Sequence, residues 1–199
     1  AEANNHKFLS GRTEIRGEIV MFKKDFEKLN SKREAEGLPI FANPRNLSAG
    51  TIRQLDPKLV AERPLRFIGY DLMRDNEQEV TTNQFAYEAM TDLGITRSPE
   101  ATVFDQFDDV MKYIDKWDTQ RHNLPYITDG IVIKINDRKL YRELGVVGKN
   151  PRGAVAYKYP AEQATTVVKD SVISIGRTGA ATPVAVFDPV VVAGSTVRH

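Results

Sequence analysis

Two kinds of hydrophobic spacing follow one another along this chain. Apolar residues at every second position are typical of half-buried strands, and apolar residues every three or four positions are typical of amphipathic helices. The spacing predicts strands at residues 11–22, 65–73, 130–136 and 154–159, helices at 23–36, 83–93 and 106–117, and short helical turns at 51–62. Residues 41–50, which are punctuated by Asn, Pro and Gly, are predicted to form a loop.

From about residue 161 the pattern changes to strands alone, at 165–176 and 183–193. We therefore predict a domain boundary near Pro160, with helices and strands mixed in residues 1–160 and only strands in residues 161–199. The mixture predicts an α+β fold. The chain begins with polar, patternless residues and stops in an extended apolar stretch, so we interpret it as part of a longer protein.

The composition, 41% hydrophobic and 28% charged residues, is typical of a globular protein. The longest apolar runs have only about four or five residues, against roughly 20 for a membrane span. No signal-peptide pattern precedes them, and the absence of cysteine fits a reducing cytoplasm, so we expect a cytoplasmic protein without a membrane partner. The absence of cysteine excludes disulfides, thiolate zinc sites and cysteine nucleophiles, and three scattered histidines do not suggest a metal site.

Charge is unevenly distributed although the net charge is +1. Residues 71–120 hold four Lys and Arg against twelve Asp and Glu, whereas residues 21–70 hold ten against six and residues 131–170 eight against four. Two basic blocks around an acidic one favour a side that faces phosphate or nucleic acid. An acidic block that consists only of two solvated helices explains the pattern equally well.

Isolated cations on predicted strands are the first candidates for chemistry. Lys134 and Lys158 each stand alone on the polar side of an apolar strand. Taken singly, such a lysine is more often on a solvated sheet face. Together with Arg45 and Arg53 in the predicted loop region, the two lysines favour an anionic ligand.

Three other positions have an ordinary and a functional interpretation. Asp129 precedes Gly130 as turn residues commonly do, and five positions separate it from Lys134, so both reach one ligand only if the chain bends at Gly130. Tyr70 is by default a core aromatic and alternatively a purine-stacking residue; the alternation of residues 65–73 places it opposite Asp71. Glu18 shares its predicted strand face with other charged residues, which indicates solvent or a polar site.

Six motifs together resemble the bacterial NAD-dependent DNA ligases, in order and at the expected spacing, over about residues 12–199. They are Thr13-Glu-Ile-Arg-Gly-Glu18, Phe41-Ala-Asn-Pro-Arg-Asn46, Ala49-Gly-Thr-Ile-Arg-Gln-Leu-Asp56, Asp129-Gly-Ile-Val-Ile-Lys134, Ala154-Val-Ala-Tyr-Lys-Tyr-Pro160 and Gly176-Arg-Thr-Gly-Ala-Ala-Thr-Pro183. The resemblance implies an antiparallel nucleotidyltransferase (adenylation) core in residues 1–160, followed by the first strands of an OB-type β-barrel in residues 161–199. It also implies a monomer that uses NAD and Mg²⁺ to seal nicks in double-stranded DNA during replication and repair.

The resemblance implies a role for each matching residue. Glu18 would contact the nucleotide ribose and the catalytic centre, Tyr70 would stack on adenine, and Lys134 and Lys158 would hold the phosphate as charge develops. Arg45 and Arg53 would serve the AMP phosphate and the nicked strand, Arg121 would be a further basic contact, and Asp129 would lie beside the α-phosphate and help to place a metal. We expect Glu18, Tyr70, Asp129, Lys134 and Lys158 to converge on one concavity.

One motif of the family is missing from these residues. The family's nucleophile lies in a Lys-x-Asp-Gly motif, and no such motif occurs in the 199 residues. We therefore expect these residues alone to be inactive, and zinc to belong only to other parts of such a ligase. Two alternatives remain: a non-catalytic module that binds nucleotide or nicked DNA, and an ATP-dependent nucleotidyltransferase.

Overall fold

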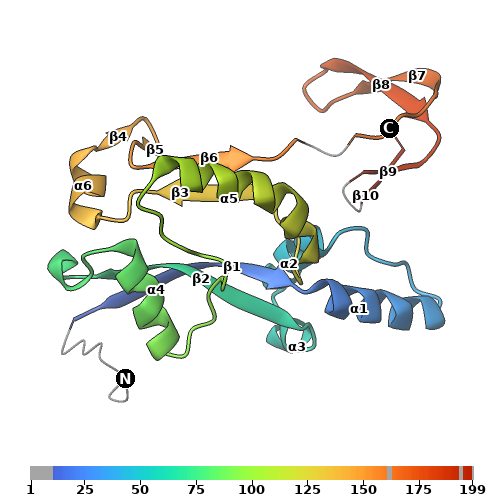
Figure 1. Ribbon diagram of the computed structural model, residues 1–199. Helices are drawn as coiled ribbons and strands as arrows, with labels where there is room; N and C mark the ends of the chain where they lie inside the picture. Colours follow the sequence, from blue (N-terminus) through green and yellow to red (C-terminus); the bar gives the residue numbers. More distant parts are fainter. Residues whose placement is uncertain (1–10, 161–162, 193–194, 199) are drawn as a thin grey trace.

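The strands of this protein form antiparallel pairs. The computed structural model describes residues 11–160, 163–192 and 195–198, so residues 1–10 and the predicted start of the second domain at 161–162 lie outside the described residues. Within them, the pairs are β1 (Thr13–Met21) with β2 (Leu65–Arg74), β3 (Gly130–Lys134) with β6 (Ala154–Lys158), β4 (Val146–Val147) with β5 (Asn150–Pro151), β7 (Val168–Ile175) with β8 (Ala181–Phe187), and β9 (Val190–Val192) with β10 (Ser195–Val197). The β1–β2 and β3–β6 pairs lie in two layers (Figure 1).

The helices connect and cover these pairs. They are α1 (Lys23–Ala35), α2 (Pro44–Ile52), α3 (Pro57–Ala61), α4 (Asn83–Asp92), α5 (Phe107–Gln120) and α6 (Arg138–Glu143), with 3-10 turns η1 (Glu77–Glu79) and η2 (Arg121–Asn123). The four strands and three long helices predicted before residue 160 are confirmed, with ends shifted by a few residues. In the described part of the chain, none of the helices combines the length and apolar character needed to cross a bilayer.

The predicted loop at residues 41–50 is wrong, because helix α2 begins inside it. The Asn43 side chain caps the helix by accepting hydrogen bonds from the backbone N–H groups of Arg45 (2.7 Å) and Asn46 (3.2 Å). Pro44 occupies the first helical position, where its missing N–H costs no hydrogen bond. The residues that suggested a loop are therefore helix-start residues, and they place Arg45 in the first turn of α2.

Helix α6 was not predicted by the apolar spacing, because it is only six residues long. Its start is marked by Asp137, whose carboxylate accepts a hydrogen bond from the backbone N–H of Leu140 at 2.8 Å. The helix follows β3 closely, so its first residue, Arg138, lies near the end of that strand. This placement matters for the site described below.

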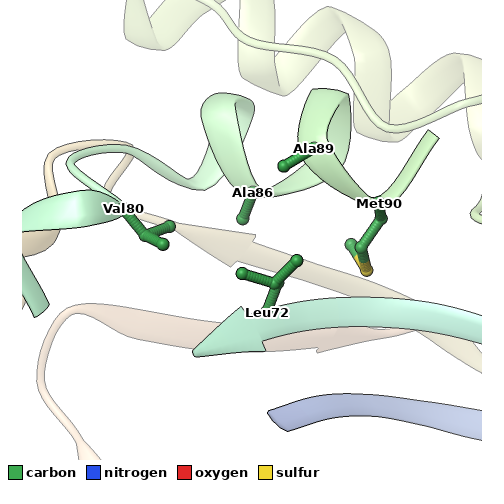
Figure 2. Close-up of a cluster of buried hydrophobic side chains, with 5 residues drawn as sticks. All are labelled: Leu72, Val80, Ala86, Ala89 and Met90. Atoms are coloured by element: carbon green, nitrogen blue, oxygen red, sulfur yellow. The ribbon is translucent and has the colours of Figure 1, made fainter. Parts of the chain in front are cut away.

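One apolar core joins α4 to the β1–β2 pair. Its buried members are Leu72, Val80, Ala86, Ala89 and Met90. Figure 2 shows the Leu72 side chain on β2 pointing toward the helix residues. The core occupies one face of the pair, and the charged residues of β1 lie on the opposite face.

We expect Leu72→Ala to lower the free energy of unfolding by about 2–5 kcal/mol, because Leu72 is completely buried and the truncation leaves a cavity. Urea denaturation followed by circular dichroism measures the change. Leu55→Ala is the matched control, since Leu55 is fully exposed and the same truncation there should change stability by less than about 0.5 kcal/mol. Equal losses in both variants would contradict this assignment of the core.

A second core packs α5 against β3–β6. It contains Ile114, Trp117 and Tyr159, with Ile131 and Ile133 of β3 against them. The Tyr159 hydroxyl donates a hydrogen bond to the Ile114 carbonyl at 2.8 Å, so this buried polar atom is satisfied. Since α5 covers one face of β3–β6, the other face is turned toward the β1–β2 layer (Figure 1).

The described residues after 163 form strands and no helix, as the sequence pattern predicts, although the strand predicted at 183–193 is divided between β8 and β9. The β7–β8 pair carries exposed apolar residues, including Ile173 and Ile175, which are 70% and 73% exposed. The strands described here do not close into a barrel. The structure thus confirms a mixture of helices and strands, and the OB-type barrel stays a prediction.

Candidate functional site

The register of β3 and β6 places Lys134 and Lys158 on the same face. Gly130 pairs with Lys158, Val132 with Ala156 and Lys134 with Ala154, so every second residue of each strand belongs to that face. Residues directly opposite each other share a face, and Ile131 and Ile133 belong to the other face, against α5. The two lysines are therefore at opposite ends of one face, separated by about 13 Å along the strand. If the two lysines lay on opposite faces of the pair, they could not line the same concavity. The register excludes that arrangement.

Lys158 belongs to a cluster of charges at one end of this face. Its Nζ lies 3.6 Å from Asp129 Oδ2, and Arg45 Nη1 of α2 lies 3.9 Å from the same oxygen. All three side chains are more than half exposed, so these ion pairs contribute little to stability. The cluster is open to solvent, and its two cations are accessible to an anionic ligand.

Gly130 explains how Asp129 reaches Lys158. A Cβ at position 130 would lie only 2.4 Å from the Tyr157 carbonyl oxygen. The two strands therefore approach each other so closely here that only glycine fits. Asp129 stays in the ladder, because its carbonyl accepts a hydrogen bond from the backbone N–H of Tyr159 at 3.2 Å. Asp129 and Lys134 consequently contact different neighbours at the two ends of β3.

Lys134 lies at the other end, against an aromatic ring. Its Nζ is 5.3 Å from the centroid of the Tyr70 ring, within the range of a cation–π interaction. Burial lowers the pKa of Lys134; Asp71 opposes this shift and Arg138 adds to it. Tyr70 as a whole is 39% exposed, so part of this residue is accessible at the edge of the site.

A β-bulge brings Tyr70 and Asp71 to the same side of β2. Arg16 pairs with Asp71 but the next residue, Gly17, pairs with Gly69, so Tyr70 is an extra residue on β2. Simple alternation predicted opposite faces for Tyr70 and Asp71. That prediction is wrong, because both side chains contact cations of the β3–α6 segment: Tyr70 contacts Lys134 and Asp71 contacts Arg138.

Glu18 and Arg53 lie on the elements that border this region. Glu18 is exposed on β1 opposite Ile68, on the strand face that also carries Glu14 and Arg16. Arg53 is exposed at the end of α2. Within the described residues, no hydrogen bond or ion pair joins either of them to Lys134 or Lys158.

Arg121 is placed differently from the other predicted cations. Its side chain is only 16% exposed and packs over the Tyr159 ring at 4.8 Å. Its Nε donates a hydrogen bond to the Asp118 carbonyl at 3.3 Å. Arg121 therefore belongs to the α5 side of β3–β6, whereas the two lysines lie on the opposite face.

The described residues do not enclose a metal site around Asp129. No group of three or more His, Cys, Asp or Glu side chains suited to a metal occurs among them, and the Asp129 carboxylate faces Lys158 and Arg45. Magnesium is commonly bound by one or two carboxylates together with substrate phosphates and water. Asp129 could therefore supply only one ligand to a Mg²⁺ ion that is otherwise bound by substrate phosphate and water. We derive no chemical step from a metal held by the protein.

The apolar spacing did not indicate the pair formed by Asp71 and Arg138. These residues are 67 positions apart, and their side chains form an ion pair beside Lys134. They border a cavity of about 360 Å³ whose lining includes Glu14, Met73, Asn83, Lys134 and Tyr141. Apolar spacing cannot reveal a contact between residues so distant in sequence. The only local signal is Asp137, a helix-capping residue, which indicates that a helix begins at Arg138.

The geometry suits a ligand with a planar group at one end and an anionic group at the other, because the Tyr70 ring of β2 borders one end of the lysine-bearing face and the exposed cations Lys158 and Arg45 lie at the other. Residues 2–162 match the family described as the NAD-dependent DNA ligase adenylation domain. The chain belongs to this family. The match includes every candidate residue of the chain and ends where the pattern changes to strands alone.

Curated DNA ligases are similar to this chain over 94% of its length. Those of Halothermothrix orenii, Thermomicrobium roseum and Carboxydothermus hydrogenoformans are 48%, 46% and 46% identical, over 189, 187 and 186 residues. The matched region is 27–28% of each relative. The chain thus spans little more than a quarter of the length of these ligases.

Proposed function

We propose that the adenylation chain binds the adenylate part of NAD along the lysine-bearing face of β3–β6. The observation that carries this proposal is the common face of Lys134 and Lys158, with Tyr70 at one end and Arg45 at the other. A purine would stack on the exposed part of the Tyr70 ring, next to the Lys134 ammonium. Its phosphate would then lie toward Lys158 and Arg45.

The charged residues of this face are suited to phosphoryl transfer. We assign Lys134 and Lys158 to the nucleotide phosphate, whose developing charge fixed cations stabilise. The side chains extend from opposite ends of the face, so Lys134 would approach from the base end and Lys158 from the Asp129 end. Glu18 would contact the ribose, and Asp129 would orient Lys158 and share a Mg²⁺ ion carried by the nucleotide.

In a complete ligase, this face would serve a reaction in three steps. A lysine amine from a Lys-x-Asp-Gly motif attacks the α-phosphorus of NAD, forms a P–N bond and expels nicotinamide mononucleotide. AMP is then transferred to the 5′-phosphate of a nick, and the 3′-hydroxyl displaces AMP to form the new phosphodiester bond. Nicked double-stranded DNA is the proposed partner, with Arg45 and Arg53 as its phosphate contacts. Arg121, packed over Tyr159, would contact a phosphate only from the α5 side of β3–β6.

We assign the domains on the same grounds. Residues 1–160 would form the adenylation domain, and residues 161–199 would begin an OB-type barrel that follows it. The end of the family match at residue 162 and the exposed apolar residues of β7–β8 support this division. Further strands outside the described residues would be needed to cover those apolar residues.

We expect Tyr70→Ala to weaken AMP binding to the adenylation chain by about 5- to 150-fold, since stacking on an aromatic ring contributes about 1–3 kcal/mol per base. Isothermal titration calorimetry with AMP measures the dissociation constants. Tyr70→Phe keeps the ring and should bind AMP nearly as the unaltered chain does. The proposed function is wrong if the unaltered chain does not bind AMP, or if Tyr70→Ala binds it equally well.

A further inference from the structure

Arg138 connects three segments around the base end of the proposed site. Its guanidinium donates to the Asp71 carboxylate, to the Leu72 carbonyl at 2.7 Å, and to Asn83 Oδ1 at 3.2 Å. The Arg138 and Asp71 side chains are only 12% and 22% exposed. The first residue of α6 is thereby bound both to β2 and to the start of α4.

Backbone hydrogen bonds extend this connection to the end of β3. Asn83 donates from its side chain to the Ile135 carbonyl at 2.8 Å, and from its backbone N–H to the Asn136 carbonyl at 2.9 Å. The backbone N–H of Arg138 donates to the Thr81 carbonyl at 3.0 Å. The residues that directly follow Lys134 are therefore held against the β2–α4 segment.

The position of Lys134 depends on this anchoring. No ion pair among the described residues holds its ammonium group, which lies over Tyr70 without a carboxylate at contact distance. Tyr70 precedes Asp71 on β2, and Lys134 precedes Arg138 by four residues. The Asp71–Arg138 pair thus joins the two strands close to the point where Lys134 meets the Tyr70 ring.

We propose that Arg138, through its contacts with Asp71 and Leu72, is a positioning residue that holds Lys134 over Tyr70 and so defines the adenine end of the nucleotide site. This proposal rests on the proposed function only for the identity of the ligand. An arginine is suited to the task because its planar guanidinium directs several N–H groups toward acceptors in fixed directions. Breaking this partly buried pair leaves a charge without its partner, so the segment would rearrange rather than keep its place.

The test uses nuclear magnetic resonance of the chain with lysines labelled with ¹³C at Cε. The Lys134 Hε protons should be displaced by the ring current of Tyr70, and Lys134→Arg identifies their signal by its loss. We expect Arg138→Gln to move this signal toward those of exposed lysines and to weaken AMP binding about tenfold. Arg142→Gln is the matched control: Arg142 is on the same helix and borders the same cavity, but pairs with Glu77 at 3.0 Å and not with β2.

Asp71→Asn is a milder second variant, because it leaves the Arg138 bonds to Leu72 and Asn83 in place. We expect it to move the Lys134 signal in the same direction as Arg138→Gln does. An effect through charge alone would instead shift the pKa of Lys134 oppositely in the two variants, since Arg138 lowers this pKa and Asp71 raises it. Oppositely shifted pKa values with an unmoved ring-current displacement would overturn the proposal.

The proposal and the proposed function fail in different ways. If the Lys134 signal in Arg138→Gln and Asp71→Asn stays as in the unaltered chain, Arg138 does not position Lys134, whatever the affinity for AMP. If the signal moves but the unaltered chain does not bind AMP, the positioning stands and the ligand is wrong. If Arg142→Gln moves the signal equally, the effect comes from α6 in general and the assignment to Arg138 is wrong.

Discussion

Replacing Lys158 with alanine is expected to slow enzyme–AMP formation by about 10²–10³-fold in a ligase that carries this segment together with a Lys-x-Asp-Gly motif. Lys158 is an exposed cation on the face of β6 that we propose binds the nucleotide, beside Asp129 and close to Arg45. Removing one preorganised charge from a developing pentacoordinate phosphate costs about 2.7–4 kcal/mol. Single-turnover measurement of AMP transfer from NAD to the enzyme gives the rate.

Lys169→Ala is the matched control for this variant. Lys169 lies on β7 and forms an ion pair with Asp188, so it belongs to the strands after residue 163. The two lysines have similar exposure, 71% and 58% of the side chain, and the substitution removes the same charge. We expect Lys169→Ala to form enzyme–AMP at the unaltered rate; equal rates in the two variants would refute the role of Lys158.

The adenylation chain alone is expected to form no covalent AMP adduct with NAD and magnesium. Adenylation needs an amine held in line with the bond that breaks, and such positioning supplies roughly 7–11 kcal/mol of the barrier. The two strand lysines of the site are assigned to charge stabilisation, and an attack by either would remove a cation from the phosphate. The 199 residues contain no Lys-x-Asp-Gly motif to supply another amine.

Intact-protein mass spectrometry after incubation with NAD and magnesium measures the adduct. A ligase that contains the Lys-x-Asp-Gly motif is the positive control, and it should gain the mass of one AMP. The expectation is wrong if the adenylation chain gains the same mass and loses it again with excess nicotinamide mononucleotide. That result would identify a nucleophile within these residues.

Much of the secondary structure followed from local spacing, because each main element carries its own periodicity. The apolar alternation of residues 130–136 indicates β3, and the helical spacing of residues 106–117 indicates most of α5. The spacing was less informative where a helix is short or begins with loop-forming residues. Helix α2, whose start at Asn43 and Pro44 resembles a loop, and the six-residue α6 are the two examples.

The sequence also identified the family, because six short motifs occur in the right order. The order and spacing of motifs can be read directly from the sequence, so a family can be identified before any residue is placed in space. The individual roles of Glu18, Arg53 and Arg121 remain predictions. The structure adds that Arg121 packs on the α5 side of β3–β6, away from the face of the two lysines.

Local spacing alone determined that Lys134 and Lys158 are isolated cations on apolar strands, and that Asp129 precedes a glycine. Only the tertiary structure decided which neighbours they have. The register of two strands that are distant in sequence puts both lysines on one face, and a bulge in β2 turns Tyr70 and Asp71 to the same side. Periodicity describes one element at a time, whereas register, bulges and pairs such as Asp71 with Arg138 arise only when separate elements pack together.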